Sequence, residues 1–157
     1  MKKKETFWLL GTVFLTLLLM LGIFGIDGFK SESDTAINVY DTYYVNSTIN
    51  LIILLTLLIL FGVYLIRMLR RNFKNLTANL IFMILNITLI LIFTFFISII
   101  NTLREIPGTV YYSGEAHEIV LNEWNNVYPI LIFIQLILII LLAISGIKTG
   151  MNYKRTQ

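Results

Sequence analysis

Residues 76–100 read LTANLIFMILNITLILIFTFFISII, a run without one charged side chain. The hydrocarbon core of a bilayer is about 30 Å thick and a helix rises about 1.5 Å per residue, so roughly 20 such residues cross it. Three further apolar runs of this kind lie near residues 7–26, 49–69 and 129–147. The pattern predicts an all-α membrane protein in which four transmembrane helices form a single domain.

Composition supports the same class. Hydrophobic residues make up 57% of the 157 residues, against about 45–50% in soluble domains. The chain contains no cysteine, which excludes disulfides and thiolate metal sites.

The charges are divided between the connections. Ten of the twelve Lys and Arg residues lie in the two terminal tails and in the connection between the second and third runs. Eight of the nine Asp and Glu residues lie in segments 27–48 and 101–127. Basic residues near span ends stay cytoplasmic, so we expect both termini inside and these two segments outside as loops. Anionic headgroups explain the basic clusters, and we expect no nucleic-acid partner.

The outer loops carry three local patterns. Residues 36–45 and 109–112 are rich in β-branched and aromatic residues, which favours extended strands; the first run fits an aromatic belt equally well. Apolar residues at helical spacing predict a short amphipathic helix over 115–127, with Trp124 in the headgroup layer. The fourth membrane helix is expected to start at Pro129, because proline suits a first helical turn.

The segment Asn38–Val45 (NVYDTYYV) resembles the segment that opens one helix in the catalytic subunit of haem-copper oxidases. In that family a histidine precedes the aspartate, and His-x-His follows a few residues later as haem ligands. Those histidines would fall on Tyr40, Thr48 and Asn50, which cannot replace imidazole. The resemblance therefore implies a shared ancestry or outer-surface motif, and no cofactor. In size the chain is more similar to small uncharacterised four-span bacterial membrane proteins, which implies a bacterial inner membrane.

A polar seam runs along the third apolar run. Asn79, Asn86, Thr94 and Asn101 fall within about 80° of one another on a helical wheel. Two interpretations remain: hydrogen bonding between helices, or a polar path for a solute. The first is favoured, because the middle of the spans holds no ionisable relay. We expect Asn86 and Gln135 both to point into the bundle and to meet directly or through water.

Aromatic residues dominate protein–protein hot spots, and exposed strands pair edge to edge. We predict that the two outer loops pack together into a small cap, with Asp41 hydrogen-bonded near the start of the second helix. The alternative is that the tyrosines only line the headgroup layer. The candidate partner surface comprises Tyr40, Asp41, Thr42, Tyr43, Tyr44, Tyr111, Tyr112 and Trp124.

Catalytic patterns are missing from the sequence. His117 is the single histidine, and the acidic loop residues around it are best explained as solvated rather than as a cation site. No phosphate-binding glycine loop or nucleophile elbow is present. We therefore predict no catalytic residue, cofactor or metal, and expect an accessory subunit or scaffold that binds a protein partner or a second copy of itself. The alternatives are a small transporter or channel component and an oxidase-related respiratory accessory protein.

Overall fold

The computed structural model describes residues 3–30, 32–39, 42–104, 108–112, 115–119 and 123–154. Its four long helices are each long and apolar enough to cross a membrane, which confirms the predicted spans. They are α1 (Lys3–Phe24), α2 (Thr48–Arg70), α3 (Leu76–Arg104) and α4 (Glu123–Lys154), and a short 3-10 helix, η1 (Asp27–Phe29), follows α1.

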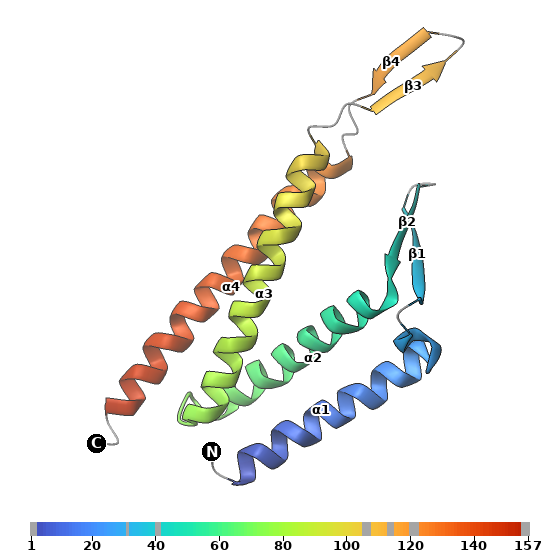
Figure 1. The fold of residues 1–157 in the computed structure, drawn as a ribbon. Coiled ribbons are helices and arrows are strands. Elements are labelled where there is room, and N and C mark those ends of the chain that lie inside the picture. The colour runs from blue at the N-terminus through green and yellow to red at the C-terminus, as the bar shows by residue number, and fades with distance from the viewer. Residues whose placement is uncertain are drawn as a thin grey trace.

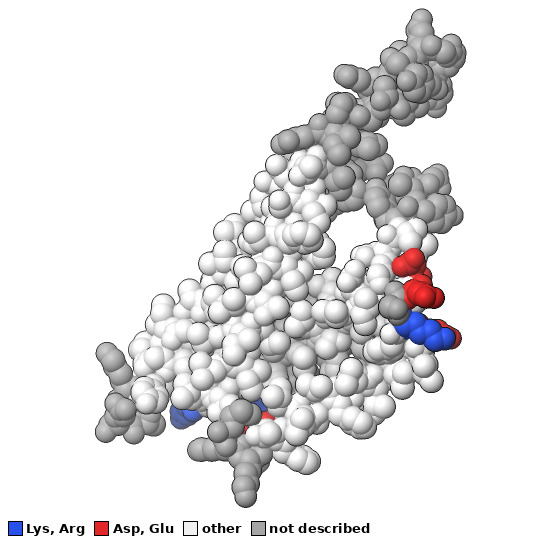
Figure 2. Space-filling model, viewed as in Figure 1, with Lys and Arg blue, Asp and Glu red and all other residues white. Residues whose placement is uncertain are grey.

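The helices run up and down in chain order, so α1 and α2, α2 and α3, and α3 and α4 are neighbours (Figure 1). The α2–α3 turn, the N-terminal end of α1 and the C-terminal end of α4 therefore share one end of the molecule, which we call the basic end. Its described basic side chains are Arg67, Arg70, Arg71, Lys74 and Lys148. The opposite, acidic end carries Asp27, Glu32 and Asp34, with Lys30 beside them (Figure 2).

Two β-hairpins extend from the acidic end (Figure 1). Strands β1 (Asp34–Val39) and β2 (Thr42–Ser47) form one antiparallel sheet, and β3 (Gly108–Tyr112) and β4 (Glu115–Ile119) form another. The strand interpretation is confirmed for 109–112 and for the described residues of 36–45, which divide between β1 and β2. The fold is therefore all-α in its membrane-spanning part only.

The predicted amphipathic helix over 115–127 is wrong. Its first part is strand β4, paired with β3, and α4 begins at Glu123 rather than at Pro129, which lies inside the helix. A helix of about a dozen residues is marginal in water. The β-prone run 109–112 offers the same residues a cross-strand partner instead, and that pairing prevails over helical spacing.

The hairpins form separate sheets and lie apart in Figure 1. The structure does not show the cap in which the two outer loops were expected to pack together. Asp41, which was expected to support that cap, lies outside the described residues.

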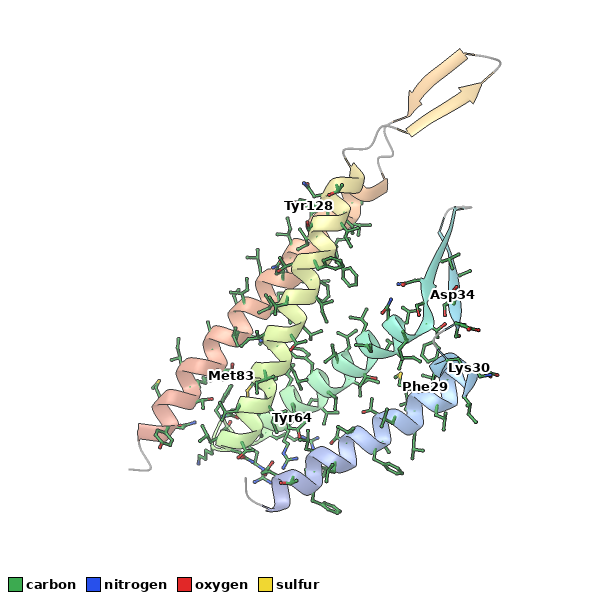
Figure 3. The ribbon with its side chains drawn as sticks, viewed as in Figure 1. Phe29, Lys30, Asp34, Tyr64, Met83 and Tyr128 are labelled. Carbon is green, nitrogen blue, oxygen red and sulfur yellow. The ribbon has the colours of Figure 1, made fainter. Side chains whose placement is uncertain are left out.

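The buried apolar core lies near the α2–α3 turn. It consists of Tyr64, Met68, Phe73, Ala78 and Phe82, with Tyr64 labelled in Figure 3. Phe61 stacks on Phe82 at a centroid distance of 5.2 Å. Many large apolar side chains elsewhere on the helices are exposed, as expected where lipid replaces water. The bundle is therefore packed most tightly at its basic end.

Candidate functional site

The predicted partner surface lies mainly on the hairpins. In β2, Tyr43 is paired with Asn38 and Tyr44 with Ile37. In β3, Tyr111 is paired with Ala116 and Tyr112 with Glu115. The four tyrosines thus belong to two different sheets, which the helices carry at the same end of the molecule (Figure 1).

Part of this surface lies outside the described structure. Tyr40 and Asp41 fall between β1 and β2, and Trp124 is placed only by its backbone at the start of α4. The side chains of Thr42, of the four tyrosines and of Trp124 are likewise outside the described part. Their role in binding a partner stays a prediction.

Thr48 joins the first hairpin to α2. Its backbone N–H donates to the Ser33 carbonyl over 2.8 Å, and its Oγ1 accepts from Ser33 Oγ over 3.0 Å. The Thr35 and Thr48 hydroxyls lie 2.9 Å apart and share a hydrogen bond. Thr48 is only 3% exposed. The base of β1 is therefore fixed to the first residue of α2.

The η1 turn packs beneath this junction. Gly28 is buried, and a Cβ added to it would lie 2.6 Å from Phe24 Cβ and 3.5 Å from Thr48 Cγ2. Only glycine fits that approach without displacing the backbone. The end of α1, the base of β1 and the start of α2 thus form one packed unit.

A mostly apolar groove of about 620 Å³ lies between α2 and α3 toward the acidic end (Figure 2). Asn46 and Asn50 stand at its hairpin side, where Asn50 Nδ2 donates to Asn46 Oδ1 over 3.1 Å. Its walls are Leu51, Ile53, Leu54, Leu91, Ile92, Phe95, Phe96 and Ile99. Helices α2 and α3 therefore separate toward the end that carries the hairpins.

The polar seam of α3 faces α4. Asn86 is fully buried, as predicted, and its Nδ2 donates to the Leu138 carbonyl over 3.0 Å. Gln135 Nε2 instead donates to Thr94 Oγ1 over 2.7 Å, and Thr94 donates onward to the Ile90 carbonyl. The expectation that Asn86 and Gln135 contact each other directly is therefore wrong. Each amide instead donates to a group of the facing helix that lies at the same depth in the bundle.

The seam continues to the basic end. Asn79 Nδ2 donates to the Phe73 carbonyl over 2.8 Å and to Thr149 Oγ1 over 2.9 Å. Asn152 Nδ2 donates to the Asn72 carbonyl over 3.1 Å. Asn72 and Phe73 adopt φ values of 46° and 61°, and their carbonyls would lack helical partners in this turn. Side chains of α3 and α4 thus satisfy the α2–α3 turn.

A buried ion pair, which was not predicted from the sequence, ties α1 to α2 at the same end. Glu5 Oε2 lies 2.6 Å from Arg67 Nη2, with side-chain exposures of 6% and 13%. Asn75 Nδ2 donates to Glu5 Oε1 over 2.7 Å, and the Arg67 guanidinium lies 4.9 Å from the centre of the Trp8 ring. One carboxylate therefore joins α1 to α2 and to Asn75, the residue that precedes α3.

The described side chains include no cluster of three His, Cys, Asp or Glu residues. What these residues do offer is polar contact between helices. Comparison with protein-family models, with curated proteins and with solved structures finds no match.

Proposed function

We propose that this multi-pass membrane protein is a non-catalytic scaffold or accessory subunit of a bacterial inner membrane. Both termini would be cytoplasmic, and the two outer hairpins would bind a protein partner. The division of charge between the two ends supports this orientation (Figure 2).

The observation that carries this proposal is that the hairpins have unpaired strand edges. Each sheet has two strands, so every strand has one edge without a ladder partner among the described residues. Such an edge is a template for an added strand. A two-stranded hairpin is also marginally stable in water, and a third strand would stabilise it.

The first hairpin is the better docking element, because it is fixed at its base. The Thr48 junction holds β1 to α2, so β1–β2 cannot rotate freely about its connection. A preorganised strand loses less conformational freedom on binding. Val45 of β2 is 67% exposed and offers an apolar contact beside the edge.

The test is site-specific photo-crosslinking from position 45 in native membranes. We expect a crosslink to one defined partner, identified by mass spectrometry, and we expect this crosslink to disappear when Tyr43 is replaced by Ala. Glu32→Lys is the matched control, because Glu32 is exposed on the same face outside the strands. If the same crosslinks persist with Tyr43→Ala, or if position 45 reaches only lipid, the docking proposal is wrong. A crosslink to a second copy of this chain would identify the partner as a homo-oligomer.

A second candidate, a small transporter, has one observation in its favour. The Oδ1 atoms of Asn79 and Asn86 are buried without a hydrogen-bond partner among the described residues, and such atoms attract water. Because the chain has no native cysteine, Asn86→Cys can be probed with a small water-soluble thiol reagent. Fast modification would favour a water-lined path, and protection would favour the scaffold.

A further inference from the structure

At the basic end, α1 and α2 enclose a pocket of about 420 Å³. It is lined by Trp8 of α1, by Val63, Ile66, Arg67 and Arg70 of α2, and by Arg71, which directly follows α2. Arg70 and Arg71 follow Arg67 by three and four residues, which places both of them on the side of the helix end that carries Arg67. The wall of the pocket is almost entirely apolar, so the three arginines line it with their aliphatic stems beside the aromatic ring and two aliphatic side chains.

The charges of this pocket are not balanced. Arg67 is held by Glu5 at 2.6 Å and packs over the Trp8 ring. Arg70 and Arg71 are exposed, and neither has a carboxylate within ion-pair distance among the described side chains. After the Glu5–Arg67 pair is neutralised, two positive charges remain at the pocket mouth.

The charged and the apolar residues of the pocket lie at different depths along α2. Ile66 and Val63 precede the exposed arginines by four to eight residues, so they lie roughly 6–12 Å deeper along the helix. A ligand that fills this pocket needs an anionic head at the helix end and an apolar part beneath it.

We propose that this pocket binds an anionic glycerophospholipid of the adjoining leaflet. Arg70 and Arg71 contact the phosphate, since guanidinium groups bind phosphate oxygens in a bidentate manner. An acyl chain lies against Val63 and Ile66, and Trp8 sits at the headgroup level that its ring prefers. A free phosphate ion would leave the apolar part of the pocket unfilled. The site does not depend on the function of the hairpins at the other end.

The test uses Trp8 as the reporter. The chain has two tryptophans, so Trp124→Phe leaves Trp8 alone beside the pocket. This variant is reconstituted into vesicles of phosphatidylcholine mixed with brominated phosphatidylglycerol, and into vesicles in which phosphatidylcholine carries the bromine. Quenching at each composition gives the relative affinity of the two lipids beside Trp8. We expect phosphatidylglycerol to be preferred by at least about five-fold for each contacting arginine.

Substitutions identify the residues that cause the preference for phosphatidylglycerol. Arg70→Gln and Arg71→Gln, singly and together, should lower it stepwise toward equal affinity. Lys74→Gln should leave it unchanged, because Lys74 is an exposed cation of the same end that does not line the pocket. Trp8→Phe, which leaves Trp124 as the reporter, should show no such preference.

Three results would overturn the proposal. One is equal affinity for both lipids beside Trp8. Another is a preference that survives Arg70→Gln and Arg71→Gln together, which would mean that the pocket does not cause it. The third is suppression by inorganic phosphate at constant ionic strength, which would assign the pocket to a free anion.

Discussion

The ion pair between Glu5 and Arg67 allows a quantitative test of how the basic end is held together. Replacing Arg67 by Met removes the guanidinium and leaves the Glu5 carboxylate, which is 6% exposed, with Asn75 as its remaining partner. Losing one member of a buried pair costs about 3–5 kcal/mol. We expect about 3 kcal/mol of unfolding free energy, the low end, because a charge-assisted hydrogen bond of about 1.5–3 kcal/mol remains.

Replacing the other member of the pair should lower the unfolding free energy by less. Glu5→Gln keeps a carbonyl oxygen that accepts from Asn75, and Arg67 keeps its contact with the Trp8 ring, worth about 0.5–2 kcal/mol. We expect a loss of about 1–2 kcal/mol. The double variant contains no unpaired buried charge, so its loss should be well below the sum of the two single losses. The resulting coupling energy should be about 1.5 kcal/mol or more.

The measurement is reversible unfolding in mixed micelles of dodecyl maltoside and sodium dodecyl sulfate, followed by circular dichroism. All four members of the cycle are compared at one pH and one ionic strength. Independent sites add within about 0.5 kcal/mol. A coupling energy inside that range would mean that the 2.6 Å contact does not hold α1 to α2.

Three further predictions follow from single substitutions. An impermeant maleimide should label Glu32→Cys and not Lys74→Cys in intact cells, because the proposed orientation has the acidic end outside; the reverse pattern would invert the topology. Asn86→Leu should lower the unfolding free energy by at most about 2 kcal/mol, the range of one interhelical hydrogen bond, and a larger loss in the same micelles would assign Asn86 a further role. Thr48→Val removes the hydroxyl that contacts Ser33 and Thr35, at a cost of about 1 kcal/mol per hydrogen bond. Amide hydrogen exchange should therefore become faster in β1–β2 and stay unchanged in β3–β4. If the exchange rates of β1–β2 are the same in the variant and the wild type, the junction does not stabilise that hairpin.

The membrane helices could be predicted because one variable, the length of an uninterrupted apolar run, determines whether a segment spans a bilayer. The outer segments could not be predicted so well. Over 115–119 the spacing of apolar residues favoured a helix, and the structure has a strand paired with β3. Pairing with a partner strand depends on the neighbouring segment, which periodicity within one segment does not measure.

The polar contacts differ in the same way. The burial of Asn86 followed from its place on the seam and the cost of an unsatisfied amide in lipid, but its partner, a backbone carbonyl, leaves no mark in the sequence. The Glu5–Arg67 pair was missed because its members are far apart in the chain. A signal was present, since Glu5 is the one acidic residue outside the outer loops and Arg67 the one charge inside an apolar run.

Taken by their polar contacts, the helices form two pairs. The first pair, α1 and α2, is joined at both ends, by the Glu5–Arg67 ion pair and by the packed junction around Thr48. The second pair, α3 and α4, is joined by the seam, with one hydrogen bond from Gln135 in the half of the pair nearer the hairpin and another from Asn79 near the turn. Each pair carries one hairpin (Figure 1).

The two pairs meet at the α2–α3 turn, at the basic end. Polar contacts join the turn residues Asn75, Phe73 and Asn72 to Glu5 of α1, Asn79 of α3 and Asn152 of α4 respectively, and the apolar core is at the same end. Toward the hairpins the pairs separate around the 620 Å³ groove. The distance between the hairpins is therefore set by the angle at the α2–α3 turn. A partner that contacts both hairpins would restrain this angle, whereas a partner on one hairpin would leave it to the contacts at the turn.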